Sequence, residues 1–578
     1  MATHWKRAAS LSELTQRNCL TTHVGKHILA LFYYQDEVFA IDNRCPHMGF
    51  PLDDGTLQDG ILTCHWHHAR FDLASGGTFD PWADDVRVFP TELRGDEVWV
   101  DVAPQTDPML QHSQRLREGL QRNISLVIAK SAIAMHQHGV DLREPFHEGV
   151  NYGVRFQRNG WGQGLTILTC MMNLMPWVEE TQRAQALFHG LSAVASDNDM
   201  ASPRHLLPSL PSFQGNMEQL TRWFRQFIEV RDAEGAERAI ITAYQGGASR
   251  AELAEMLFAA ATDHRYINGG HTLDFINKAL EALDITDWED AEAVLSSLTP
   301  ILADAQRMEE SNAWRHPIDL VAIVERSFDE IPQALAEGKE KQPAARDTDE
   351  LQHALFSDDP QVIAQALLIA LKRGFRPEDL AAEVAFAAAR RIAHFHTSNE
   401  FGDWDTALHT FTFANAVHQG LVRIPSLTLL RGVWDAAMSV YLDRFLNIPA
   451  ARIPSASLNG SSPEELLQRF SRLLDHQQQV NEAAQLTLDY TADSGSIPQL
   501  LAKLGEMLLR EDRDFHTIQC LEAAARQLKH WQGTERTTLL LVAAARYLAA
   551  HAPTMRAQRQ TFLNAQRLSR GELLHSDS

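Results

Sequence analysis

The stretch CPHMGFPLDDGTLQDGILTCHWH, residues 45–67, carries a cysteine and a histidine near each of its ends. Cys45 and His47 are two residues apart, and Cys64 and His67 are three residues apart. Thiolate and imidazole groups are the ligands preferred by zinc, copper and iron–sulfur centres. The spacing predicts a metal site built by two short loops, each of which supplies one sulfur and one nitrogen ligand.

Three interpretations of these four residues stand side by side. A zinc site can use two Cys and two His, but zinc fingers usually pair like with like, as Cys-x-x-Cys followed by His-x-x-x-His. In a Rieske-type [2Fe–2S] centre one iron takes both thiolates and the other takes both histidines, so each loop spans both irons. An accidental cluster is the third interpretation. The mixed pairs fit the Rieske arrangement most directly.

The residues around the two loops have the pattern of β-structure. Runs of β-forming residues at 27–34 and 38–42 flank a short turn, and so do the runs at 86–93 and 97–102. Each pair predicts a β-hairpin. We therefore expect an all-β domain over residues 1–104.

Residues from about 5 to 104 resemble a Rieske ferredoxin domain over nearly the whole segment. The family's Cys-Pro-His-x-Gly loop stands at residues 45–49, and its second loop stands at residues 64–67. The resemblance implies one [2Fe–2S] cluster per chain, with Cys45, His47, Cys64 and His67 as its ligands. His68 departs from the family, which usually has glycine at that position, and this puts the backbone of the second loop in question.

Four positions indicate the subtype. Phe50 and Trp66 stand where respiratory-chain Rieske proteins carry the two cysteines of a disulfide. Ala69 and Phe71 stand where those proteins carry hydroxyl groups that bond to cluster sulfur. Such hydrogen bonds raise the reduction potential because they stabilise the added electron. Their loss predicts a potential near the low end of the Rieske range of roughly −150 to +300 mV, which suits an electron donor to an oxygenase.

The whole-chain composition excludes several classes of protein. The 578 residues are 44% hydrophobic and 22% charged, which is typical of globular chains. The net charge of −23 argues against binding to a phosphate backbone, so no nucleic-acid partner is expected. No run approaches 18 uncharged apolar residues, and the first residues lack an apolar signal segment, so we expect a cytoplasmic protein with no membrane partner. Five cysteines in this length do not make a disulfide scaffold.

From about residue 110 the sequence acquires helical periodicity, which predicts an all-α region. At an offset of 127, residues 239–261 resemble residues 366–388, and each copy has the pattern of a helix, a glycine and a second helix opened by an acidic residue. The coinciding positions are Ala239/Ala366, Ala243/Ala370, Gly247/Gly374, Leu253/Leu380 and Leu257/Val384. A chance match between two Ala-rich helical hairpins is the alternative to a duplication. The polar stretch 336–350 predicts a linker between two helical halves, residues 110–335 and 351–578.

The helical region lacks two familiar redox motifs. No Gly-x-Gly-x-x-Gly follows a predicted strand, so we expect the electrons to come from a separate flavin/NAD(P)H reductase or a ferredoxin. Ring-hydroxylating Rieske oxygenases bind iron through Asp/Glu-x-x-His-x-x-x-x-His, and no two histidines after residue 110 are five positions apart. The resemblance to those oxygenases therefore ends with the N-terminal domain.

Other histidines suggest a different metal site. His264 and His271 lie just after the first repeat copy, and His396 and His409 lie just after the second. If the copies pack around a pseudo-twofold axis, these four candidate catalytic residues face each other and suit a mononuclear non-haem iron. The alternative is structural, since a histidine at a helix C-terminus, such as His264, interacts favourably with the helix dipole.

Two weaker resemblances concern the helical region. It is similar to questin-oxidase-like proteins, some of which use a histidine-rich non-haem iron, and its helix–Gly–Glu–helix pairs resemble carboxymuconolactone-decarboxylase-like domains. The Cys-x-x-Cys of some of the latter is missing here. Neither resemblance assigns a role to any residue of this chain.

Two functions follow from these observations. In the first, the Rieske cluster delivers electrons to a helical domain that holds a non-haem iron and oxidises a small organic substrate with O₂. In the second, the protein is an electron carrier whose helical domain is a non-catalytic docking or sensing module.

Overall fold

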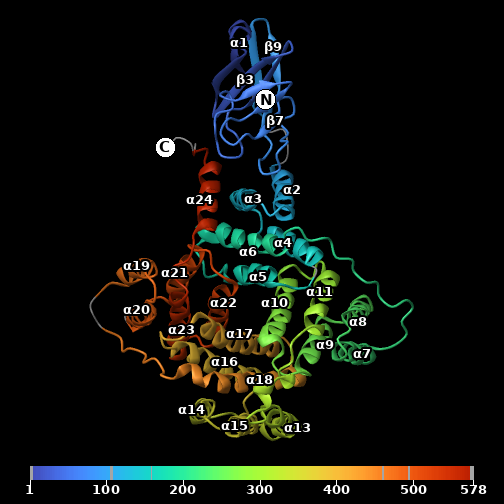
Figure 1. Ribbon diagram of the computed structural model, residues 1–578, viewed down its shortest axis with the longest axis vertical. Helices are drawn as coiled ribbons and strands as arrows, with labels where there is room; N and C mark the ends of the chain where they lie inside the picture. The colour runs from blue at the N-terminus through green and yellow to red at the C-terminus, as the bar shows by residue number, and fades with distance from the viewer. Residues whose placement is uncertain are drawn as a thin grey trace. The chain divides into compact units, whose positions relative to one another are not determined.

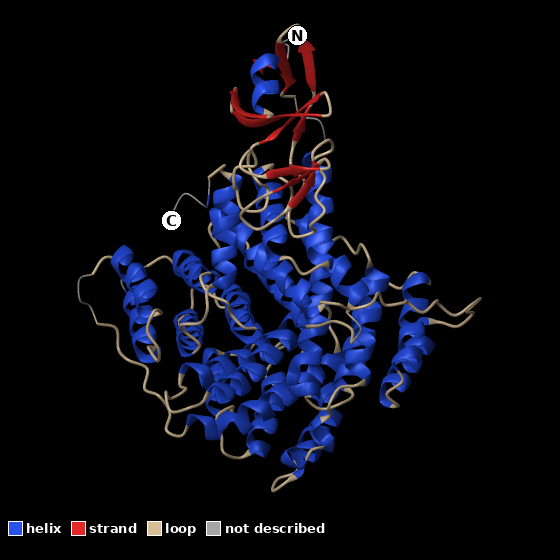
Figure 2. Ribbon diagram, turned by 45° about the horizontal axis from the view of Figure 1, so that its top comes forward, coloured by secondary structure: helices blue, strands red, loops and turns tan. Residues whose placement is uncertain are grey.

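The computed structural model describes residues 4–103, 108–157, 159–457, 461–492, 495–572 and 574. The described chain begins with β-sheets and continues with helices, as predicted (Figures 1 and 2). By its internal contacts it divides into two compact units, Met1–Pro145 with Ala557–Ser578, and Phe146–Arg556. The predicted end of the β domain, residue 104, lies outside the described residues.

The β domain holds ten strands and one short helix. These are β1 (Trp5–Ser10), α1 (Leu11–Arg17), β2 (Cys19–Val24), β3 (His27–Tyr34), β4 (Glu37–Asp42), β5 (Thr56–Gln58), β6 (Ile61–Thr63), β7 (Arg70–Asp72), β8 (Val88–Phe89), β9 (Thr91–Arg94) and β10 (Glu97–Asp101). They form three antiparallel sheets of order β1-β10-β9, β2-β3-β4-β8 and β5-β6-β7.

The first predicted hairpin is confirmed, because β3 pairs with β4. The second predicted hairpin is confirmed in part, because β9 pairs with β10. Residues 86–93, expected to be one strand, are two strands in two sheets, with Pro90 between them. Proline cannot donate a hydrogen bond to a sheet, so it ends β8 and lets the chain cross to the second sheet as β9.

Strand β3 is buried on both faces and joins the two cores of this domain. Leu29 and Leu31 belong to one cluster of buried side chains, together with Val98 and Val100 of β10. Ala30 and Phe32 belong to the other cluster, which also contains both cysteines of the metal-binding motif. Successive side chains of a strand point to opposite faces, so this one strand holds the metal-binding loops against the rest of the domain.

Besides α1, the described helices of the first unit are α2 (Pro108–Gln121), α3 (Ser125–Gln137) and α24 (Ala557–Ser569). Helix α3 packs against both α2 and α24. The C-terminal end of the chain therefore completes the unit that begins at the N-terminus.

The second unit is entirely helical in its described residues. Its α-helices are α4 (Arg143–Phe156, which starts just before the unit), α5 (Gln163–Leu174), α6 (Arg183–Asp197), α7 (Met217–Glu229), α8 (Ala233–Gln245), α9 (Arg250–Thr262), α10 (His271–Ile285), α11 (Ala291–Ala303), α12 (Asn312–Arg315), α13 (Leu320–Gly338), α14 (Ala345–Ala354), α15 (Pro360–Lys372), α16 (Pro377–Ala393), α17 (Phe401–Arg423), α18 (Leu427–Leu442), α19 (Pro463–Leu473), α20 (Val480–Ala492), α21 (Ile497–Leu509), α22 (Phe515–His530) and α23 (Arg536–Ala550). No described helix is both long enough and apolar enough to cross a membrane.

The helix pairs α8–α9 and α15–α16 coincide with the two predicted repeat copies. When residue 239 is aligned with residue 366, both ends of α8 fall on the ends of α15, and the start of α9 falls on the start of α16. The linking glycines, Gly247 and Gly374, have positive φ values of 86° and 96°. Helices α10 and α17 follow the two pairs and pack against each other (Figure 1). The repeat therefore brings the segments that follow each copy together.

The stretch 336–350 includes the end of α13 and the first part of α14, and residues 339–344 between these helices are not helical. Most of its side chains are exposed, which accounts for the polar composition that predicted a linker. Helix α13 packs against α15 across this stretch. The boundaries between the two compact units follow Pro145 and Arg556, outside this stretch. The division of the helical region into the halves 110–335 and 351–578 stays a prediction.

Candidate functional site

The loops 45–49 and 64–68 have matching backbone hydrogen bonds. The N–H of Gly49 donates to the carbonyl of Cys45 (2.8 Å), and the N–H of His68 donates to the carbonyl of Cys64 (3.0 Å). Each loop is closed by its cysteine, whose N–H donates to the carbonyl of Phe50 or Ala69. Gly49 and His68 have φ values of 85° and 63°. The second loop thus keeps the left-handed turn that the glycine of the family provides, with a histidine in its place.

The two thiols lie together in the core of the β domain. Cys45 is 2% exposed, Cys64 is 1% exposed, and their sulfurs are hydrogen-bonded to each other. The hydrogen bond from Cys45 lowers the pKa of Cys64 to about 6, and the backbone N–H groups of Trp66 and His67 act in the same direction against the effect of burial. A thiol that ionises near neutral pH is ready to bind a metal ion.

The two imidazoles lie next to each other, with ring centroids of His47 and His67 4.8 Å apart. Burial lowers the pKa of His47 to about 4, so the ring is neutral, as a ligand must be. His47 Nδ1 is buried and has no hydrogen-bond partner among the described residues. Buried nitrogens are rarely left unpaired, and a metal ion bound there accounts for this one. The donor set of two thiols and two imidazoles therefore fits a [2Fe–2S] cluster of the Rieske type.

Helices α2 and α3 bring charged groups to the first loop. Lys130 of α3 donates to the carbonyl of Pro46 and lies 2.9 Å from Asp84, which also binds Arg115 of α2 at 2.8 Å. Burial would raise the pKa of Asp84, but the two cations outweigh it and lower that pKa. Trp82 packs edge-on against His47, with ring centroids 4.7 Å apart. Lys130 also contributes to the lowered pKa of His47, which places a positive charge close to this ring.

A second group of histidines lies in the helical unit. His271 is the first residue of α10, His409 lies in α17, and His516 is the second residue of α22. Each offers a ring nitrogen, and the three nitrogens lie within 4.8 Å of one another. The Nε2 atoms of His409 and His516 are 2.9 Å apart. Two nitrogens bound to one metal ion at about 2.1 Å, at right angles, are separated by roughly 3 Å. The spacing therefore suits adjacent ligands of a single ion.

The environment of this histidine triad favours neutral rings. Burial, and then the neighbouring histidines, lower the pKa of His271 to about 3 and that of His409 to about 4. All three side chains remain partly accessible. A site with three protein ligands and an accessible face is typical of catalytic metal ions, whereas structural sites are closed by four ligands.

The carboxylate of Asp405 faces the side of the His516 ring that points away from the other two histidines. Asp405 Oδ2 lies 3.8 Å from His516 Nδ1, the ring nitrogen on the other side from Nε2. The hydroxyl of Tyr547 donates to Asp405 Oδ1 at 2.6 Å, and His551 Nε2 lies 3.5 Å from the same oxygen. Burial would raise the pKa of Asp405, but these partners lower it to about 2. An ionised carboxylate behind a histidine is the usual support for a metal-binding imidazole.

The turn before α10 sets the position of His271. Tyr266, Asn268, Gly269 and Gly270 have φ values of 39°, 50°, 62° and 93°. A Cβ atom on Gly270 would lie 3.0 Å from Phe413 Cβ and 3.2 Å from the Tyr266 ring. Backbone held in such conformations is typical of functional sites.

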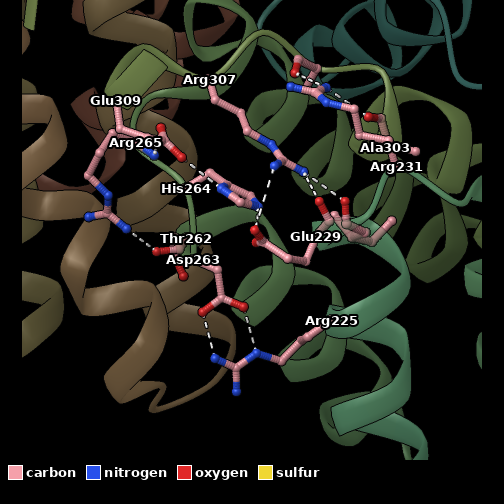
Figure 3. A network of polar contacts seen from close by, with 12 residues as sticks. Arg225, Glu229, Arg231, Thr262, Asp263, His264, Arg265, Ala303, Arg307 and Glu309 are labelled. Atoms are coloured by element: carbon pink, nitrogen blue, oxygen red, sulfur yellow. Dashed lines mark hydrogen bonds and ion pairs between the residues drawn. The ribbon is translucent and has the colours of Figure 1, made fainter.

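The structure brings together two of the four predicted helical histidines. The rings of His271 and His409 face each other with centroids 4.5 Å apart. His396 lies elsewhere and accepts a hydrogen bond from the backbone N–H of Ser398. His264 lies in a separate polar network at the end of α9 (Figure 3). Its Nδ1 is 2.7 Å from Glu309 and its Nε2 is 3.3 Å from Glu229.

Figure 3 shows why His264 is not available as a ligand. Both of its ring nitrogens face carboxylates, and the network continues from Glu229 to Arg307. Nearby, Asp263 binds Arg225 of α7 through both carboxylate oxygens. His264 thus ties the end of α9 to its neighbours.

The third member of the triad, His516, was missed from the sequence. It lies outside both repeat copies, so the correspondence between the copies does not lead to it. One signal was present: Asp514 caps α22, and His516 follows in the first turn of a long Ala-rich helix. His271 likewise stands at the start of its helix.

Comparisons with known proteins concern the N-terminal domain. The family model described as "Rieske [2Fe-2S] domain" matches residues 4–90. The naphthalene 1,2-dioxygenase ferredoxin component of Pseudomonas aeruginosa is 29% identical over 104 residues, which cover 18% of this chain and all of that protein. The 3-phenylpropionate/cinnamic acid dioxygenase ferredoxin subunit of Photorhabdus laumondii is 30% identical over 13% of this chain and 75% of its own length. Among solved structures, the ferredoxin of carbazole 1,9a-dioxygenase from Nocardioides aromaticivorans matches with 28% identity and a TM-score of 0.16, covering 18% of this chain and 98% of that one.

Proposed function

Because the N-terminal domain of this chain belongs to the Rieske [2Fe–2S] family of dioxygenase ferredoxins, which implies electron transfer, we propose that it passes single electrons to a metal centre in its own helical region. In this proposal Cys45 and Cys64 hold one iron of the cluster, and His47 and His67 hold the other. The two buried thiols and the unpaired Nδ1 of His47 support this assignment.

The second part of the proposal is an oxidation at the histidine triad. His271, His409 and His516 hold a mononuclear non-haem iron, and a small organic substrate is oxidised with O₂ on its accessible face. The observation that carries this proposal is the convergence of three imidazoles, with the carboxylate of Asp405 3.8 Å from the outer ring nitrogen of one of them. A bound iron would supply the activation of O₂, which organic side chains do not provide.

The roles of the side chains follow from their contacts. The imidazoles bind through the nitrogens that face one another, and the carboxylate of Asp405 lies on the Nδ1 side of His516, away from the Nε2 atom that binds. The electrons come from a separate flavin/NAD(P)H reductase or a ferredoxin. The overall reaction RH + O₂ + 2 H⁺ + 2 e⁻ → ROH + H₂O requires two electrons, and the cluster carries them one at a time.

A second candidate function is that of an electron carrier with a non-catalytic helical domain. The match to the Pseudomonas relative favours it, because that ferredoxin is matched over its full length by the first fifth of this chain. In this case the triad holds no redox metal.

Metal content separates the two functions. Anaerobic reconstitution with iron and sulfide is followed by measurement of iron and of the cluster absorption. We expect about three irons per chain for the oxygenase and about two for the carrier. The variant His516→Ala should lose only the third iron, whereas His264→Ala and His396→Ala should keep it. Two irons in the unsubstituted protein, with a complete cluster spectrum, would exclude a metal at the triad.

A further inference from the structure

Helices α10 and α22 face each other through four successive pairs of polar side chains. His271 lies opposite His516, Asp274 opposite Gln519, Lys278 opposite Glu522 and Glu281 opposite Arg526, so the register between the two helices stays nearly constant. The His271 and His516 rings are 5.6 Å apart, and the two ion pairs measure 2.7 Å and 3.2 Å. We call these four pairs the polar ladder, and its first rung belongs to the histidine triad.

The polar ladder is buried along most of its length. Asp274, Lys278, Gln519 and Glu522 are each 1% exposed, and Glu281 is 7% exposed. At the last rung the side chain of Arg526 is 29% exposed. The ladder therefore runs from the triad, through buried side chains, to a group that solvent reaches.

The charges on the ladder leave one carboxyl without a cation of its own. Lys278 is within 3.0 Å of both Glu281 and Glu522, and Arg526 is within 3.2 Å of the same two carboxylates. Two cations and two anions balance in this group. The fifth titratable side chain, Asp274, has a hydrogen bond only from the amide of Gln519 among the contacts of the described residues.

Asp274 therefore tends to keep its proton. Burial raises the pKa of Asp274 to about 7, although Lys278 and the Gln519 amide oppose this, while Glu522 and Glu281 act in the same direction as burial. From α5, the neutral thiol of Cys170 and the amide of Asn173 face this group, and Asn173 donates to both glutamates. A buried carboxylic acid with this pKa can both give up and take back a proton near neutral pH.

The side-chain oxygen of Gln519 is an acceptor for such a proton. Its Oε1 atom is buried and has no hydrogen-bond partner among the described residues. This acceptor lies on the side chain that contacts Asp274, where it can bind a water molecule or, with the amide turned over, the carboxyl proton itself.

We propose that Asp274 is a proton-relay residue for the triad, supplying a proton that O₂ reduction consumes there and taking one back from solvent at the accessible face of the triad. The proposal rests on the proposed function, since it needs a metal at the triad and electrons from the cluster. Rungs three residues apart are separated by about 4.5 Å along the helix axis, a gap that one water molecule between Asp274 and a group bound at the triad would span. Each reaction cycle takes up two protons with the two electrons, and Asp274 delivers at least one of them.

The first test needs no metal at the triad. Infrared difference spectra of the full chain, lacking iron at that site, compare the unsubstituted protein with Asp274→Asn between pH 5 and pH 8. We expect the C=O stretch of a protonated carboxylic acid, lost in the variant and fading as the pH passes about 7. The control is Asp197→Asn, which removes an exposed carboxyl whose pKa is also raised, at the far end of α5 from Asn173. A carboxyl band that is the same with and without Asp274 at every pH would overturn the proposal.

The second test measures where the electrons go. Iron-loaded protein is reduced photochemically and mixed with O₂, and the peroxide released is measured. Reduced O₂ that takes both of its protons from solvent, and none from Asp274, leaves as hydrogen peroxide, so Asp274→Asn should raise the peroxide yield severalfold, Asp274→Glu should restore it in part, and Asp197→Asn should leave it unchanged. A peroxide yield unaffected by Asp274→Asn, in protein with a filled triad and an intact cluster spectrum, overturns the relay alone. An empty triad overturns the proposed function, and with it the relay, whatever the infrared spectra show.

Discussion

Gly49 and His68 occupy the same position in the two cluster-binding loops. Each follows its cysteine by four residues, donates its N–H to that cysteine's carbonyl and adopts a positive φ. Glycine adopts this conformation without strain, whereas a side chain with a Cβ costs roughly 1–2 kcal/mol there. The second loop therefore carries strain that the first does not.

Replacing His68 with glycine should stabilise the β domain. We expect His68→Gly to raise the free energy of unfolding by about 1 kcal/mol, offset in part by the greater freedom of glycine in the unfolded chain. Denaturant unfolding followed by the cluster absorption measures the change. Gly49→Ala, the matched substitution in the first loop, should destabilise by a similar amount; a stabilising Gly49→Ala would show that the two turns are not equivalent.

Lys130 should raise the reduction potential of the cluster. Its ammonium group lies close to His47, and a positive charge stabilises the electron that the cluster gains. Lys130→Met should lower the potential by on the order of 50 mV, which is about 1 kcal/mol for a one-electron couple. A redox titration followed by electron paramagnetic resonance checks this. The exposed Lys26 serves as the control, and Lys26→Met should leave the potential unchanged.

The protein without metal at the triad should lose stability as the pH falls from about 6.5 to about 4. An unfolded histidine takes up a proton near pH 6.5, but folded His271 and His409 do so only near pH 3 and pH 4. The unfolded state binds more protons within this window, so acid favours unfolding there and has no such effect above it. His271 alone contributes on the order of 3 kcal/mol at pH 4.

Unfolding curves of the metal-free protein at several pH values measure this loss. His271→Asn should flatten the dependence between pH 6.5 and pH 4. Substituting the exposed His205 by Asn should leave it unchanged. Equal slopes for all three proteins would contradict the burial of a neutral imidazole at position 271.

Asp405 should strengthen metal binding without touching the metal. Its carboxylate faces the ring nitrogen of His516 opposite to the one that binds. Asp405→Asn should weaken binding of Fe²⁺ or Co²⁺ at the triad by roughly 10–100-fold. Asp403→Asn is the control on the same helix, because Asp403 accepts a hydrogen bond from the N–H of Glu400 at the helix start. Titration with Co²⁺, followed by its visible absorption, gives both affinities.

A methyl group at Gly270 should displace His271. The added Cβ would lie 3.0 Å from Phe413, in a backbone conformation that disfavours any side chain. Gly270→Ala should therefore cost roughly 1–3 kcal/mol in stability and lower the metal content of the triad, with the cluster spectrum unchanged. Gly247→Ala is the matched control for strain alone: its φ is also positive, but no atom lies within 4 Å of the added Cβ. Equal metal content in both variants would falsify the positioning role of Gly270.

The cluster loops were predictable from the sequence because all four candidate ligands lie in the single stretch 45–67 and the loops keep a fixed backbone. The repeat was also predictable from local sequence, because Gly247 and Gly374 each lie between the two helices of a similar pair. Residues 86–93 were wrongly predicted to form one strand, although Pro90, which separates β8 from β9, is visible in the sequence. The triad was predictable only in part, because His516 reaches it from α22, far along the chain from His409, through packing that no local pattern encodes. His264 does not belong to the triad, and the sequence does not show that Glu309 and Glu229 face both of its ring nitrogens.

Helix α24 has a consequence for how this protein is made. It packs on α3, and the side chain of Gln137 donates to Ser569, near the other end of the chain. A ribosome releases the β domain early, but the hairpin of α2 and α3 lacks its partner helix until residues 557–569 have been made. During that interval the apolar side of α3 is uncovered and must be shielded by chaperones. Removing α24 therefore acts on the cluster-bearing unit, although α24 lies far along the chain from the cluster-binding loops.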